Sequence, residues 1–406
     1  MAGSRPSVSR RRVLVLAAAA AAMPPALADW ASRSVAAAEP LRQIRPGGPS
    51  GLLAIGASGA LWALSLGGAA PQKLASGLDP ESPLATGHGR IAARHADGGL
   101  WLWERGQAQR GRDVVLAARA GLLMLPLAVV GVAVDSQANA QRLVRMEPEG
   151  GRGWSVVARS TDAVLPDARP LQADLDARGD GGHLVVLAGP DGGRYDHGAL
   201  GDGIEATRLL WLERHRLQVM RELSLPTPHV FEDIAPRAVA LAKGIGLLTV
   251  RSGPMGSQLA LVTADPTQAN RLQVAALGDA LGTRHRWLAP TTDGLRLLAV
   301  HTPHIGGVLH EYRLAGERLA SRIVARDLST HRLGSRELDL AVWLGPRLVV
   351  PSQNGMRLRV LDASSGWGET DSAALPARLA MTVALPDARG LAALLDDGSV
   401  TSFGMR

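Results

Sequence analysis

The sequence predicts an all-β fold made of repeated units, and three observations support this prediction. The chain has 406 residues, of which 46% are apolar, and no stretch beyond its N-terminal segment shows a sustained helical period. Short apolar runs instead alternate with turns such as Asp97-Gly98-Gly99 and Asn354-Gly355, which close β-hairpins. Finally, a Gly opens each run at intervals of about 30 to 60 residues. These residues are Gly51, Gly89, Gly121, Gly181, Gly244, Gly294, Gly345 and Gly390.

A repeat of this length built from hairpins is typical of the blades of a β-propeller, each with about four antiparallel strands. Dividing residues 39–406 by seven gives about 53 residues per blade, so we expect seven blades. The eight hairpins leave eight blades as the alternative. We expect the last blade to combine the C-terminal hairpin near Phe403 with a strand from the mature N-terminus.

The N-terminus has the order of a secretory signal. Arg10, Arg11 and Arg12 precede an apolar run over residues 13–23, which is too short to span about 30 Å of hydrocarbon as a helix. Small-residue cleavage patterns end at Ala28 and Ala38. We therefore expect a removable leader over residues 1–38, cleaved after one of these two Ala residues, and a single propeller domain over residues 39–406.

The run that begins Ser9-Arg10-Arg11 resembles a twin-arginine signal. That resemblance implies export of the folded chain to the periplasm or the medium. It also implies the twin-arginine export machinery and a signal peptidase as partners.

Charge and Cys content exclude several classes of site. The formal net charge is +7, but residues 1–38 hold five Arg against Asp29, which leaves +3 for the domain. For a domain of this size that charge is close to neutral, so the basic balance of the whole chain is weak evidence for nucleic acid or membrane binding. We expect no nucleic-acid partner and, because the N-terminal apolar run is short, no stable membrane insertion. The chain has no Cys, which excludes disulfides and thiolate metal sites.

Five segments between residues 171 and 362 resemble exported bacterial β-propellers of the FG-GAP/VCBS-repeat type. They are residues 194–202 (RYDHGALGD), 230–237 (VFEDIAPR), 286–290 (RWLAP), 302–307 (TPHIGG) and 333–338 (LGSREL). They follow one another over nearly half the chain, whereas residues before about 171 match only in general repeat style.

In that family each repeat usually carries an Asp-x-Asp-x-Asp-Gly loop, whose carboxylates suit Ca²⁺. Here the corresponding positions at residues 240–246 and 341–346 contain no carboxylate. Asp174, Asp176 and Asp180 are the exception, in a loop stretched by two residues. We therefore expect no cofactor, with Ca²⁺ in this vestigial loop left open. The alternative is a solvated turn whose Asp side chains cap their own backbone.

No catalytic motif is present: there is no Gly-x-Ser-x-Gly elbow, no phosphate-binding loop and no dinucleotide fingerprint. Loops at one end of a propeller gather around the channel mouth and often bind ligands. The alternative for polar residues in these loops is that they join neighbouring blades, for example through ion pairs. The candidate binding residues are His197, Asp202, Glu232, Asp233, Arg237, Trp287, His304, Arg336 and Glu337.

Two functions remain open from the sequence. The first, which we favour, is a periplasmic non-catalytic binding or interaction scaffold whose partner is an unknown protein or small ligand. The second is a periplasmic propeller enzyme, such as a lyase, a hydrolase or a quinone-type dehydrogenase, with its active site on the channel face.

Overall fold

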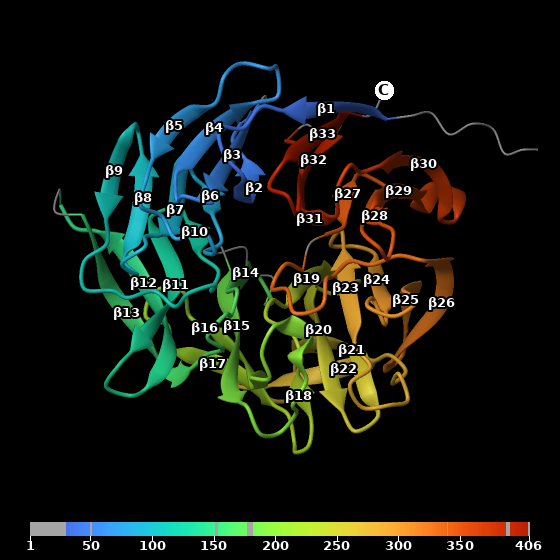
Figure 1. Cartoon of the computed structure of the whole chain (residues 1–406). Coiled ribbons are helices and arrows are strands. Elements are labelled where there is room, and N and C mark those ends of the chain that lie inside the picture. Colours follow the sequence, from blue (N-terminus) through green and yellow to red (C-terminus); the bar gives the residue numbers. More distant parts are fainter. Residues whose placement is uncertain are drawn as a thin grey trace, which may run out of the picture.

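The computed structural model describes residues 30–48, 51–150, 153–176, 182–338, 340–386 and 390–404, and it is a β-propeller (Figure 1). Apart from two short 3-10 helices, η1 (Gly198–Leu200) and η2 (Ala363–Ser365), its regular elements are strands. No helix in these ranges is long and apolar enough to cross a membrane. Ser9, Arg10, Arg11 and both residues flanking the first cleavage position lie outside the described residues.

Within the described ranges, the strands form eight blades of four antiparallel strands, which is the alternative count that the sequence left open. Blades 1 to 4 are β2–β5 (Leu41–Pro46, Gly51–Gly56, Leu61–Ser65, Gln72–Ala75), β6–β9 (Ala85–Gly87, Arg90–Arg94, Leu100–Glu104, Gln107–Arg110), β10–β13 (Leu123–Leu125, Ala128–Asp135, Ala140–Pro148, Trp154–Ala163) and β14–β17 (Leu171–Ala173, His183–Asp191, Glu205–Leu212, Val219–Ser224). Blades 5 to 7 are β19–β22 (Arg237–Ala240, Ile245–Gly253, Gly256–Ala264, Leu272–Leu277), β23–β26 (Leu288–Thr292, Leu297–His301, Val308–Ala315, Arg318–Arg326) and β27–β30 (Val342–Leu344, Arg347–Pro351, Arg357–Asp362, Gly368–Ala374). Blade 8 is β31–β33 (Leu379–Ala384, Gly390–Leu395, Val400–Gly404) with β1 (Ala31–Val35).

Blades 4, 5 and 6 are joined into one continuous sheet. The short strand β18 (Val230–Phe231) lies in the link between blades 4 and 5 and pairs with both β16 and β20. A single parallel bridge between Leu277 and Arg318 connects blade 5 to blade 6. Four of the five segments that resemble FG-GAP/VCBS repeats lie in these three blades and the links between them, and the fifth, residues 333–338, lies in the link to blade 7.

The chain termini close the ring, as the sequence predicts. Strand β1 is the outer strand of blade 8 and pairs with β33 from Ala31↔Gly404 to Val35↔Val400 (Figure 1). Trp30 packs against Phe403, with ring centroids 6.0 Å apart. The propeller therefore begins before residue 39, and the predicted boundary after residue 38 would place β1 in the leader. Cleavage after Ala28 leaves this strand on the mature chain, whereas cleavage after Ala38 removes it.

The middle strands of the blades are buried because neighbouring blades pack against both of their faces. The pattern of β3, Gly-Leu-Leu-Ala-Ile-Gly, is an unbroken apolar run of this kind, and from Leu52 to Gly56 every residue is buried. Strands β15 and β20 contain similar runs, and their side chains belong to one core that extends through blades 3 to 6. The packed blades hold the loops between them in fixed positions.

Candidate functional site

All nine candidate residues from the sequence lie on one face of the propeller. In a blade of four antiparallel strands, the turn between the second and third strands lies on the same side as the links to the neighbouring blades. We call this side the linker face. Each candidate residue falls in such a turn or link, or at the first residue of the strand that follows it.

Glu232 is the centre of a buried polar cluster on the linker face. It lies between blades 4 and 5 and is fully buried, and its carboxylate forms a hydrogen bond with Nδ1 of His197 from blade 4. The hydroxyls of Ser252 and Ser257, at the facing ends of β20 and β21, donate to the same carboxylate. Trp287, in the link to blade 6, donates from Nε1 to the Glu232 carbonyl oxygen at 3.1 Å. Glu232 thus connects three consecutive blades.

The arrangement of Ser252, Glu232 and His197 does not make the serine a nucleophile. In a Ser-His-acid arrangement the hydroxyl donates to the imidazole, which takes its proton. In this cluster the carboxylate lies in the middle and accepts from both Ser252 and His197. The geometry is that of a satisfied buried carboxylate.

Asp233 forms an ion pair with Arg237, which is the alternative that the sequence left open for such residues. Its Oδ2 is 3.0 Å from Nη1 of Arg237, and it also accepts from the hydroxyl of Thr249 at 3.1 Å. Its Oδ1 accepts from the backbone N–H groups of Ile234 and Ala235. These bonds hold the start of blade 5. A binding role for Asp233 and Arg237 stays a prediction.

Trp287 and His304 belong to a second chain of contacts that includes a residue the sequence did not single out. His304 stacks on Trp287, and its Nε2 is 3.0 Å from Nδ1 of His331. Nε2 of His331 in turn donates to the carbonyl oxygen of Ser335 at 2.8 Å. Burial lowers the pKa of His304 to about 4 and that of His331 to about 3, so both rings are neutral at neutral pH.

Residues 332–337, which we call the mouth strap, extend from the link between blades 6 and 7 to blade 4. Arg336 places Nε 2.7 Å from Asp167 and also binds Asp202. The backbone N–H of Gly334 donates to the carbonyl of Ala199 at 2.9 Å. A Cβ at Gly201, where φ is 100°, would lie 2.8 Å from the Gly334 carbonyl oxygen, so only glycine fits this contact. The inter-blade pairing that the sequence left open for Arg336 is present.

Glu205 is a further buried carboxylate that the sequence did not single out. It begins β16 and is 2% exposed. Burial, followed by the charge of nearby Glu232, raises its pKa well above the ordinary value for a glutamate. Its only signal in the sequence is an acidic residue at the start of an otherwise largely apolar strand.

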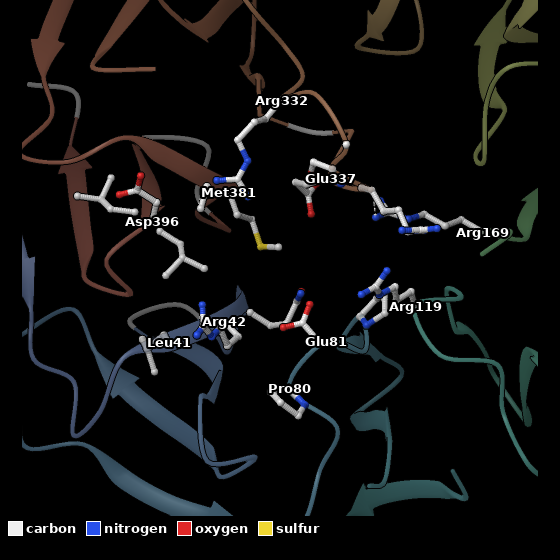
Figure 2. A pocket seen from close by; sticks show the side chains of 18 residues that line it. Leu41, Arg42, Pro80, Glu81, Arg119, Arg169, Arg332, Glu337, Met381 and Asp396 are labelled. Atoms are coloured by element: carbon white, nitrogen blue, oxygen red, sulfur yellow. Dashed lines mark hydrogen bonds between the residues drawn. The ribbon is translucent and has the colours of Figure 1, made fainter. Parts of the chain in front are cut away.

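A cavity of about 420 Å³ opens at the channel mouth on the linker face (Figure 2). One part of its wall is apolar and includes Met381 and Leu394 from blade 8. The mouth strap forms another part, so Arg336 and Glu337 are the two candidate residues that line the cavity. Its charged side chains are Arg42, Arg119, Arg169, Arg332, Arg336, Glu81, Glu337 and Asp396.

The other candidate residues lie away from this cavity lining. His197, Glu232 and Trp287 are in the buried clusters that join blades 4 to 6. Conversely, the sequence did not single out Arg42 or Arg119, because each stands alone in a different blade or link without a repeated motif. Only closure of the ring brings them to one cavity.

The vestigial calcium loop stays a prediction. Asp174 and Asp176 follow β14, whereas Asp180 lies outside the described residues. Among the residues that the structure describes, no group of three or more His, Asp or Glu side chains is arranged to hold a metal ion.

Comparison with solved structures supports the propeller fold. The chain is similar to Sqt1 from Saccharomyces cerevisiae, with 10% identity and a TM-score of 0.63 over 93% of this chain and 99% of that one. It is also similar to the Dos1 propeller (10% identity, TM-score 0.61, 93% and 95% covered) and to BamB from Moraxella catarrhalis (14%, 0.54, 94% and 98%). No family model and no curated protein matches the sequence. At these identities the likeness identifies the chain as a β-propeller by its fold.

Proposed function

We propose that the protein is an exported, non-catalytic binding propeller of the FG-GAP/VCBS-repeat type, and that it binds its ligand or partner at the channel mouth. The observation that carries this proposal is the cavity of about 420 Å³, where charged side chains from several blades and links converge. Cavities of this size, with convergent polar groups and an apolar wall, are typical of small-ligand sites.

The buried clusters favour binding over catalysis. A catalytic acid or base must reach its substrate, and its pKa must be matched to the reaction. The carboxylates of Glu232 and Asp233 are instead almost fully buried and are engaged with groups of the protein. Their role in the proposal is to hold the links that shape the mouth.

Export by the twin-arginine route fits the closure of the ring. That route carries folded chains, and β1, which completes blade 8, begins shortly after Ala28, the first of the two expected cleavage positions. We infer that signal peptidase cleaves after Ala28, because cleavage after Ala38 would remove the closing strand. The mature chain then begins at Asp29.

Native mass spectrometry of the full chain purified from the periplasm of a Gram-negative host tests this function. We expect a mature N-terminus at Asp29 and a retained ligand or protein partner. Arg119→Glu in the mouth should abolish retention. The matched variant Arg105→Glu, in the β8–β9 turn on the opposite face, should retain it. Cytoplasmic location, or retention that is equal in both variants, would contradict the proposal.

A further inference from the structure

We propose that the channel mouth binds a small organic dicarboxylate, with one carboxylate on each side of the cavity. This inference rests on the proposed function, because it names the ligand class of the same site. It is carried by the placement of four arginines around the cavity, by the fixed mouth strap, and by the limited size and mixed lining of the site.

The four arginines form two groups in the mouth (Figure 2). Arg119 and Arg169 lie on the right of the cavity in this view, whereas Arg332 lies on its upper wall and Arg42 on its lower wall, both to the left of that pair. The links that carry Arg119 and Arg169 are adjacent, since the N–H of Gly121 donates to the carbonyl of Ala168 at 3.0 Å. Like charges held together in this way are stabilised by an anion placed between them.

Three of these arginines are available to a ligand. Within the described ranges, the side chains of Arg42, Arg119 and Arg332 take part in no hydrogen bond or salt bridge. Arg42 and Arg119 are exposed, and Arg332 is half-buried. A guanidinium offers two parallel N–H groups that match the two oxygens of a carboxylate.

The mouth strap is fixed before any ligand arrives. Arg336 is held by Asp167 and Asp202, and Arg169 donates to the Arg336 carbonyl oxygen. The strap therefore positions Arg332 at little cost in conformational entropy on binding, which favours affinity for a small ligand.

The rest of the lining restricts the ligand to a small molecule. Glu81, Glu337 and Asp396 add negative charge to the lining of the cavity, which disfavours a long polyanion. Met381, a largely buried residue of the wall, lies between Arg332 and Arg42 in this view and offers an apolar contact (Figure 2). A short aliphatic chain with a carboxylate at each end satisfies both features.

Isothermal titration calorimetry of the full mature chain with succinate, glutarate and adipate tests the inference, with butyrate and glutaramide as matched probes. We expect at least one dicarboxylate to bind, and butyrate and glutaramide to bind at least about tenfold more weakly, because butyrate loses one charge-assisted contact and the uncharged glutaramide loses both. Arg119→Gln and Arg42→Gln should each weaken binding by about tenfold or more. Arg105→Gln on the opposite face should leave it unchanged.

Several results would overturn the inference. They are the absence of dicarboxylate binding up to millimolar concentration, equal binding of butyrate, or an equal effect of Arg105→Gln. If dicarboxylates fail while the chain from the periplasm still retains a partner that Arg119→Glu releases, the ligand class is wrong and the proposed function stands. If both fail, the proposed function fails as well.

Discussion

Replacing Trp30 tests whether the N-terminal strand closes the ring. Trp30 precedes β1, is 7% exposed and packs on Phe403 in the core between blades 7 and 8. Removal of a buried Trp side chain costs about 3–5 kcal/mol in the free energy of unfolding. A folded domain has only about 5–15 kcal/mol in total, so Trp30→Ala removes a large share of the stability.

Urea unfolding of the chain that begins at Asp29, followed by circular dichroism, measures this loss. Ser32→Ala is the matched control, because Ser32 is an exposed residue of the same strand and its replacement should change stability by less than about 0.5 kcal/mol. A chain that begins at Glu39 lacks both Trp30 and the β1–β33 pairing and should lose at least as much as Trp30→Ala. If Trp30→Ala behaves like Ser32→Ala, β1 does not close the ring and the assignment of the Ala28 cleavage position loses its basis.

Three further predictions concern the linker face. Burial raises the pKa of Glu205 in the folded state, so the folded chain holds this proton more tightly than the unfolded chain does. The free energy of unfolding therefore falls as the pH rises above about 4.5, the ordinary pKa of the side chain. Glu205→Gln should therefore raise the melting temperature at neutral pH and have little effect below pH 4. Arg336→Gln leaves the carboxylate of Asp167 buried without its cation and should cost about 3 kcal/mol in urea unfolding, whereas Arg313→Gln on an exposed strand should cost almost nothing. The pKa of His331 is lowered to about 3 in the folded state, so its contribution to stability is complete above pH 6.5 and is lost as the pH falls toward 3. In His331→Gln, the free energy of unfolding should therefore fall less steeply between pH 6.5 and pH 3 than in the parent chain.

The fold could be predicted because local signals repeat in every blade. Apolar runs and Gly turns determine hairpins, and their recurrence indicates a propeller. The blade count was less certain because blades differ in length. Blade 2 extends only from Ala85 to Arg110 and blade 7 from Val342 to Ala374, whereas blade 4 extends from Leu171 to Ser224. The loops between strands are therefore shorter in blades 2 and 7 than in blade 4. Division of the chain by an average length therefore favoured seven blades over the eight observed.

The candidate site could be predicted only in part. Sequence motifs identified His197, Glu232 and Arg336, and the structure places these residues on one face, mainly as contacts between blades. The arginines of the cavity carry no local signal. Arg42 and Arg332 are almost 300 residues apart and line one cavity only because the ring is closed.

Hydrogen–deuterium exchange of the full mature chain, with and without periplasmic extract, tests directly whether the channel mouth binds a ligand or partner. We expect slower exchange in the links that line the mouth, at residues 80–83 and 332–337 and around Arg119, with no change in the β8–β9 turn on the opposite face. Protection confined to the opposite face or to the outer strands of the blades would contradict binding at the channel mouth.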